Sequence, residues 1–140
     1  VTSMVAGQLG AKNIKAIALM APAAVLRDNA RAGEFFGVSY DPQNPPEYVE
    51  IFRGLKVGRN YITVAQNLPI YETAAGYKGA ACIIHGTGDV VVPYTYGARF
   101  HDIWKNSEFL LLPNVDHSFT QDTAEAAKLA ADFFAKQLIK

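Results

Sequence analysis

The strongest constraint on the fold of this 140-residue chain is an apolar run at residues 80–84 that leads directly into a glycine-rich turn. A short apolar run bounded by turn residues predicts a strand buried on both faces of a parallel sheet. Gly86 and Gly88 follow it, and glycine allows the backbone to turn sharply. Asp89 therefore lies just past the carboxyl end of a buried strand, at the edge where open α/β sheets bind ligands.

A second strand is predicted at residues 108–112, with a helix-like segment at 94–105 between the two strands. This order is typical of a βαβ unit, in which both strands point the same way and the crossover is right-handed. His117 follows the second strand, so we expect Asp89 and His117 side by side at one sheet edge. Other expected elements are a strand at 14–20, a short strand at 36–40, and helices at 1–9, 60–68 and 121–139.

Composition excludes several classes of function. The chain has 13 acidic and 13 basic side chains, so its net charge predicts binding to neither nucleic acid nor an anionic membrane. Its apolar runs are all well short of the roughly 18 residues of a membrane helix. The single cysteine, Cys82, allows no intrachain disulfide and is expected to be a small core residue.

An aspartate and a histidine at neighbouring strand ends suit acid–base chemistry. The carboxylate would hold the imidazole in one tautomer and stabilise the imidazolium. The structural alternative is that Asp89 only caps the next helix and His117 only lies at the top of a strand. A metal site is the weaker interpretation, because no third ligand has a convincing spacing. We interpret His85 as a hydrogen-bonded histidine at a strand end and His101 as a surface or half-buried helix residue.

A Ser-His-Asp triad also needs a nucleophile, and the sequence does not supply a recognisable one. The nucleophile elbow has the pattern Gly-x-Ser-x-Gly on a strand-to-helix turn. None of the four serines (Ser3, Ser39, Ser107 and Ser118) lies in that pattern, and Cys82 lies inside a strand. The chain thus carries a candidate acid and base without a candidate nucleophile.

Residues 25–71 differ in composition and periodicity from the rest of the chain. This stretch is rich in glycine, proline and aromatic residues and has little regular period. A segment of this length and composition is either a long irregular connection or a functional insertion. Its aromatic residues argue against disorder because they bury large apolar areas. We favour a cap over the active edge.

Several stretches together resemble a known family. They are residues 20–24 (MAPAA), 37–42 (GVSYDP), 65–72 (AQNLPIYE), 84–89 (IHGTGD) and 116–119 (DHSF). Across almost the whole chain, the sequence resembles the carboxyl-terminal half of α/β-hydrolase esterases, specifically the bacterial cinnamoyl or feruloyl esterases. The acid motif at 84–89 is common to many α/β-hydrolases, whereas the motifs at 37–42 and 65–72 are more specific.

The resemblance implies an α/β fold: the carboxyl-terminal half of an α/β-hydrolase parallel sheet, with residues 1–140 in one domain and an inserted cap at 28–71. It implies that Asp89 is the triad acid and His117 the triad base. Tyr61 matches a tyrosine that binds the phenolic end of the substrate. Asn29 stands where some relatives have an aspartate, and Phe36 where a polar residue is usual.

The resemblance further implies hydrolysis of hydroxycinnamic-type esters through an acyl-enzyme, without metal or organic cofactor. The serine elbow would end immediately before Val1, so the expected partner is an amino-terminal half, in the same enzyme or a separate chain. A small aromatic ester is the expected substrate, nucleic acid and membrane are not expected partners, and a homodimer stays open. We expect a cytoplasmic location, with secretion left open.

Two alternatives remain at this point. The first is a broader acyl esterase, thioesterase or peptidase on the same fold, because fold alone does not choose among them. The second is a non-catalytic fragment. In either case we expect residues 1–140 alone to be inactive.

Overall fold

A three-stranded parallel sheet in the order β1-β6-β7 organises the larger of two compact units. The structure, a computed structural model, describes residues 1–139. The larger unit comprises Val1–Ala23 and Pro69–Lys140, and the smaller one comprises Ala24–Leu68. We call them unit 1 and unit 2.

Strand β6 (Ala80–Gly86) is the central strand of unit 1, and all of its residues are buried. It pairs in parallel with β1 (Ala16–Met20) on one side and with β7 (Ser107–Leu112) on the other. An uninterrupted apolar strand is expected in this position, because helices cover both faces of a parallel sheet. The strand predicted from residues 80–84 is confirmed and extends through His85 and Gly86.

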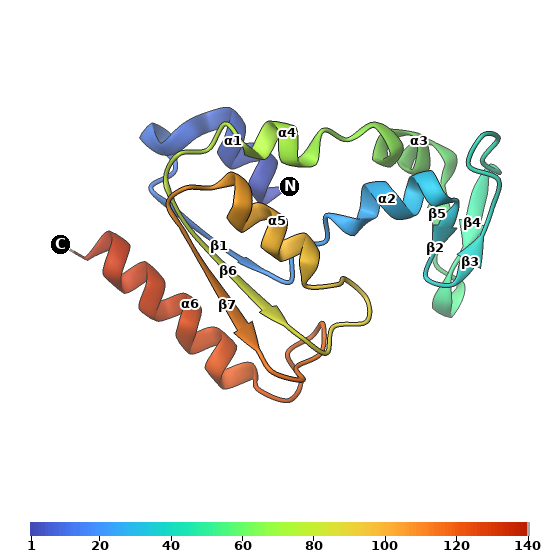
Figure 1. The fold of residues 1–140 in the computed structure, drawn as a ribbon. Coiled ribbons are helices and arrows are strands. Elements are labelled where there is room, and N and C mark those ends of the chain that lie inside the picture. Colours follow the sequence, from blue (N-terminus) through green and yellow to red (C-terminus); the bar gives the residue numbers. More distant parts are fainter. Residues whose placement is uncertain (140) are drawn as a thin grey trace. The chain divides into compact units, whose positions relative to one another are not determined.

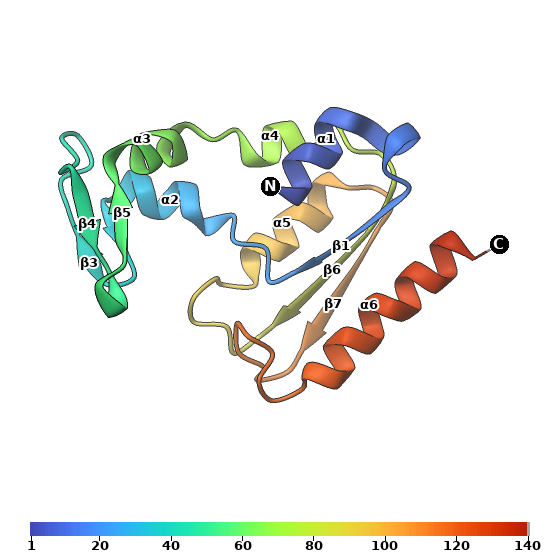
Figure 2. The same cartoon turned by 180° about the vertical axis from the view of Figure 1, so that it is seen from behind.

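Alternate residues of β6 face different helices. Helix α6 (Thr123–Leu138) covers one face, where Cys82 and Ile84 pack in a cluster with Ala126 and Phe133. Helix α5 (Thr95–Ile103) covers the other face, and its Gly97 lies against the side chains of Ile83 and His85. Figures 1 and 2 show α5 and α6 on opposite sides of the sheet. This alternation follows from the two-residue period of a strand.

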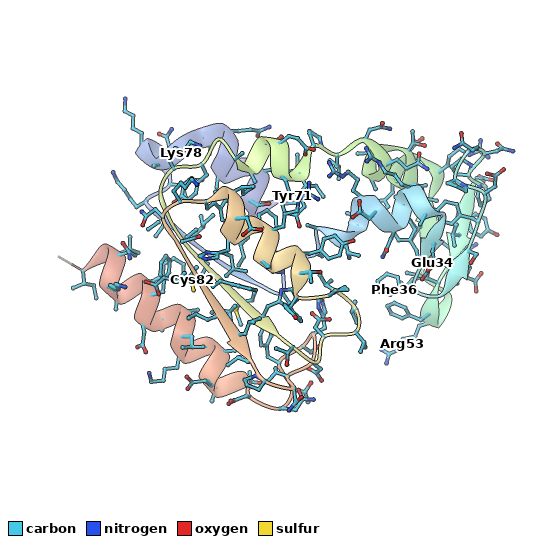
Figure 3. The ribbon with its side chains drawn as sticks, in the orientation of Figure 1. Glu34, Phe36, Arg53, Tyr71, Lys78 and Cys82 are labelled. Atoms are coloured by element: carbon cyan, nitrogen blue, oxygen red, sulfur yellow. The ribbon has the colours of Figure 1, made fainter. Side chains whose placement is uncertain are left out.

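The expected core position of Cys82 is confirmed. Its side chain has no exposed surface, and Figure 3 shows it within the sheet. Burial, with a further contribution from the Glu108 carboxylate, raises the pKa of the thiol to about 11. Because the thiolate is the nucleophilic form of cysteine, Cys82 is chemically inert at neutral pH.

Two further helices complete unit 1. Helix α1 (Thr2–Asn13) is interrupted at Gly10, where φ is 71°, so the predicted helix 1–9 continues as a second short turn. It packs against α4 (Ile70–Ala74) so closely that a Cβ on Gly7 would lie 1.9 Å from the Thr73 carbonyl oxygen. None of the helices in residues 1–139 is long and apolar enough to cross a membrane.

Unit 2 has its own small core. Its elements are α2 (Val25–Ala32), β2 (Glu34–Phe35), β3 (Val38–Ser39), β4 (Tyr48–Glu50), η1 (Phe52–Gly54), β5 (Lys56–Gly58) and α3 (Arg59–Asn67). The core residues are Ala30, Phe35, Val49, Ile62 and Ala65. The strands form two antiparallel pairs, β2-β3 and β4-β5. Residues 25–71 are therefore largely ordered into short elements.

The predicted strand at 36–40 is confirmed only in its middle, where Val38–Ser39 form β3. Phe36 and Gly37 form the turn between β2 and β3, with φ of 49° at Phe36 and 79° at Gly37. A positive φ is rare for an aromatic residue, so the apolar pattern alone favoured a strand there. The Phe36 ring packs edge-on against Phe52, 5.1 Å between centroids, and Figure 3 shows it beside Arg53.

Candidate active site

Hydrogen bonds join the loops that follow β6 and β7. The amide of Thr87 donates to the Leu112 carbonyl (2.9 Å), and the amide of Gly88 donates to the Val115 carbonyl (3.1 Å). The amide of Asn114 donates in return to the Thr87 hydroxyl (2.8 Å). Parallel strands bring their carboxyl ends to the same edge, and these bonds hold the two loops together there.

Two glycines permit this close approach. A Cβ on Gly86 would lie 2.0 Å from the Val115 carbonyl oxygen, and one on Gly88 would lie 3.0 Å from the backbone of Asn114. Residue 86 has no room for a side chain, because backbone atoms occupy the space, and a side chain at residue 88 would fit only if the backbone of Asn114 shifted slightly. The glycines of the 84–89 motif thus bring the loop carrying Asp89 against the loop carrying His117.

The buried Asp89 carboxylate accepts hydrogen bonds from two backbone amides and two imidazole rings. Oδ1 accepts the amides of Val91 (2.9 Å) and Val92 (2.8 Å). Oδ2 contacts His117 Nδ1 at 2.8 Å and His85 Nε2 at 3.1 Å. An ionised carboxylate has about four acceptor positions, so these four contacts satisfy it. The hydrogen bond expected between Asp89 and His117 is present.

The pKa of Asp89 is lowered from its ordinary value. Burial is the largest influence and by itself would raise it. The amide of Val92, the His117 side chain and the amide of Val91 together outweigh burial. Because hydrogen bonds to the charged form favour ionisation, Asp89 is a carboxylate at neutral pH despite having no exposed side-chain surface.

His117 is half-buried, with 34% of its side chain exposed. An ionised Asp89 can only accept, so His117 Nδ1 carries the hydrogen of their bond. In a neutral imidazole, the other nitrogen, Nε2, then has a lone pair that can accept a proton. Chemically, the pair is an oriented general base with a buried counter-charge.

His85 also contacts Asp89, which the sequence analysis did not anticipate. The sequence predicts a hydrogen-bonded histidine at a strand end, and Nε2 of His85 is hydrogen-bonded as predicted. Its buried Nδ1 has no hydrogen-bond partner among the described residues. The available signal was the spacing of four residues between His85 and Asp89 across a glycine turn.

The three predicted substrate-binding residues all lie in unit 2. Asn29 is half-buried in α2, Phe36 is exposed at the β2–β3 turn, and Tyr61 is half-exposed in α3. The Tyr61 ring lies 6.0 Å from the ring of Phe35. Unit 2, Ala24–Leu68, is close in extent to the expected cap at 28–71. The cap role itself stays a prediction.

Neither a metal centre nor a serine placed beside His117 as a nucleophile is evident in residues 1–139. No group of three or more metal-binding side chains gathers in this part of the chain. Ser107 contacts His101 Nδ1 (2.7 Å), and its hydroxyl is also 2.7 Å from the Trp104 carbonyl. Ser107 begins β7, however, at the opposite end of that strand from His117, and His101 is exposed as expected.

The parallel sheet, its flanking helices and the two loops match part of an α/β-hydrolase fold. Est1E from Butyrivibrio proteoclasticus superposes with a TM-score of 0.91 and 28% identity, covering 99% of this chain and 57% of that one. Est1E with ferulic acid bound gives 0.92 and 28%, covering 99% and 55%. The expected resemblance to the cinnamoyl and feruloyl esterase type of α/β-hydrolase is therefore confirmed.

A more distant structure shares the fold. CarC, a serine hydrolase involved in carbazole degradation, has a TM-score of 0.54 and 15% identity, covering 96% of this chain and 59% of that one. No family model and no curated protein matches the sequence. The chain spans a little over half the length of Est1E.

Proposed function

We propose that this chain supplies the acid and base of a serine hydrolase that cleaves carboxylic esters. The observation that carries the proposal is the hydrogen bond of 2.8 Å between buried Asp89 and half-buried His117. Each residue follows a parallel strand of an α/β-hydrolase-like sheet, and the likeness to Est1E supports the assignment. In this order, the acid precedes the base along the chain, as in other α/β-hydrolases.

The reaction has two halves. A serine hydroxyl attacks the ester carbonyl while His117 Nε2 takes its proton, and the tetrahedral intermediate collapses to an acyl-serine. The imidazolium gives that proton to the departing alcohol. Water then attacks the acyl-serine with His117 again as base, which releases the acid and restores the serine. Asp89 orients His117 and stabilises the imidazolium, and no metal or organic cofactor takes part.

The nucleophile comes, in this proposal, from polypeptide outside these 140 residues. None of their four serines stands in an elbow sequence. One oxyanion donor of this fold is the amide after the nucleophile and another comes from an earlier loop, so both would lie in the same additional polypeptide. The proposed partner is thus an amino-terminal half, in the same protein or a separate chain.

For the substrate, we propose an ester of a hydroxycinnamic-type acid. Unit 2 has exposed aromatic side chains, including Phe36 and Tyr61, which suit a flat acyl group. Est1E has been solved with ferulic acid bound. In the proposed cap, Tyr61 and Asn29 bind the phenolic end, and Phe36 contributes an apolar wall.

The test is ester hydrolysis by the complete protein or assembly. His117→Ala is expected to lower kcat by roughly four orders of magnitude or more, as loss of a triad base does elsewhere. The exposed histidine variant His101→Ala is the matched control and should retain activity. If His117→Ala hydrolysed chromogenic cinnamoyl and short-chain esters at the wild-type rate, the proposed function would be wrong.

A further inference from the structure

A buried histidine at the end of β6 has no part in the mechanism above. His85 has no exposed surface, and its Nε2 lies 3.1 Å from Asp89 Oδ2 and 2.9 Å from the carbonyl oxygen of Val92. A carbonyl oxygen only accepts hydrogen bonds. Nε2 must therefore carry a hydrogen, which it shares between the Val92 carbonyl and the Asp89 carboxylate.

The other nitrogen of the His85 ring, Nδ1, lies in different surroundings. Nδ1 is buried and has no hydrogen-bond partner among the described residues. With the hydrogen on Nε2, Nδ1 of the neutral ring is an acceptor without a donor. An unsatisfied buried polar atom costs stability. The hydrogen bonds of Nε2, rather than any contact of Nδ1, are therefore what a histidine contributes at this position.

The ring is held from its other side by helix α5. A Cβ on Gly97 would come 2.7 Å from His85 Nδ1 and 3.2 Å from the side chain of Ile83. The absence of a side chain at residue 97 thus lets the Nδ1 atom of the ring come close to the helix. The ring is confined between Gly97 on one side and Asp89 with Val92 on the other.

We propose that His85 is a positioning residue that fixes the rotation of the Asp89 carboxylate, an inference that rests on the proposed function. Two backbone amides hold Oδ1, and the imidazole of His85 is a second donor to the oxygen that His117 uses. Without His85, the half-buried His117 ring is the only described side chain that restrains Oδ2. The carboxylate can then rotate away from His117.

Two substitutions at residue 85 separate this role from simple packing. His85→Leu keeps a buried apolar body and removes the donor, whereas His85→Gln places an amide N–H near the former Nε2 position. Gly97→Ala leaves His85 intact and pushes its ring toward Asp89. Gly58→Ala is the matched control, because its added Cβ would meet nothing nearer than 4.0 Å.

The readouts are the downfield proton NMR signal of the His117 Nδ1–H and the kinetics of ester hydrolysis, both in the complete protein or assembly. The NMR signal is assigned by its loss in His117→Ala. His85→Leu is expected to shift or broaden it and to lower kcat about 10- to 100-fold with little change in KM. His85→Gln should restore most of the signal position and most of kcat. Gly97→Ala should shift the signal, and Gly58→Ala should change neither the signal nor kcat.

An unchanged His117 signal in folded His85→Leu would overturn the proposal. If His85→Leu does not fold, the signals of Gly97→Ala and His85→Gln test the proposal in its place. An unmoved signal in Gly97→Ala, or a displaced one in His85→Gln, would count against it. If even the wild type hydrolyses no ester, the proposed function fails, while the NMR comparison still shows whether His85 positions Asp89.

Discussion

At the scale of single residues, Asp89 is the most constrained group in the site. Its carboxylate accepts two amides on one oxygen and two imidazoles on the other, within a buried environment. Asparagine has the same shape but only one acceptor oxygen. Its amide nitrogen would have to face either the two backbone amides or the two histidines.

We therefore expect Asp89→Asn to lower the free energy of unfolding by about 1–3 kcal/mol at neutral pH. Ester hydrolysis should fall roughly 10⁴-fold, because the amide no longer stabilises the imidazolium. Chemical denaturation and steady-state kinetics of the complete protein measure the two effects. A fully active Asp89→Asn variant would contradict the role of the carboxylate.

The pKa of Asp89 also sets a pH dependence. It is lower in the folded chain than in the unfolded chain, where aspartate titrates near pH 3.9. Between the two values the unfolded state binds more protons, so stability rises with pH there. The contribution of Asp89 is thus present above about pH 4 and is lost as pH falls through its folded pKa.

We expect melting temperatures between about pH 2 and 6 to fall more steeply with acid for the wild type than for Asp89→Asn. Asp116, whose pKa is lowered mainly by the amide of Thr120, is the comparison because its hydrogen bonds lie at the surface, and Asp116→Asn should flatten the curve less. Parallel curves for wild type and Asp89→Asn would show that the carboxylate is not stabilised as described.

A further prediction at the scale of single residues concerns the proposed substrate contact of Tyr61. Its half-exposed ring in α3 is the proposed contact for the phenolic end of the acyl group. Tyr61→Phe should raise KM for hydroxylated cinnamoyl esters more than for unsubstituted ones, because only the former lose a hydrogen bond. Equal effects on both substrates in side-by-side kinetics would reject the proposed contact.

The sequence predicted part of the site for a physical reason. Asp89 and His117 follow two strands of a parallel sheet, and that topology alone brings them to one edge. The second contact of Asp89, with His85, depends on how tightly the glycine turn folds back, and periodicity does not report that. The position of a buried ring against Gly97 depends equally on side-chain packing between β6 and α5.

At the scale of elements, the sequence predicted those helices and strands whose burial leaves a clear pattern of apolar residues. Strands β1, β6 and β7 and helix α6 have continuous or amphipathic apolar patterns and were located to within a few residues. Helix α2 was missed because it is short and highly polar. Its buried Arg27 donates a hydrogen bond to the carbonyl of Leu68, which is distant in sequence, and the local pattern of residues does not reveal such a contact. Pair β4-β5 was missed because each strand has only three residues.

The close approach of the two loops yields a prediction at this scale. Gly86→Ala would place a Cβ 2.0 Å from the Val115 carbonyl oxygen, so the loop carrying His117 must move. We expect a loss of about 1–3 kcal/mol in unfolding free energy, together with a large loss of kcat. Chemical denaturation with Gly58→Ala as control measures the first, since residue 58 has room for a methyl group. A Gly86→Ala variant as stable as the control would contradict the described packing.

At the scale of the whole molecule, the two units divide the proposed work. Unit 1 carries the proposed acid and base, and unit 2 carries the proposed binding residues. Strand β1 pairs only with β6 among the described residues, and Met20 at its end is exposed. An unpaired apolar edge strand favours association with further chain. Under our proposal, the polypeptide that supplies the serine also covers this edge.

The central claim is that Asp89 and His117 serve a serine outside these residues. The most direct measurement treats the complete protein or assembly with a fluorophosphonate ester, which labels activated serines, and locates the label by mass spectrometry. We predict label on a serine of an elbow sequence outside residues 1–140, lost in His117→Ala, and no labelling or ester turnover by purified residues 1–140. Label on one of the four serines within residues 1–140, dependent on His117, would contradict the account.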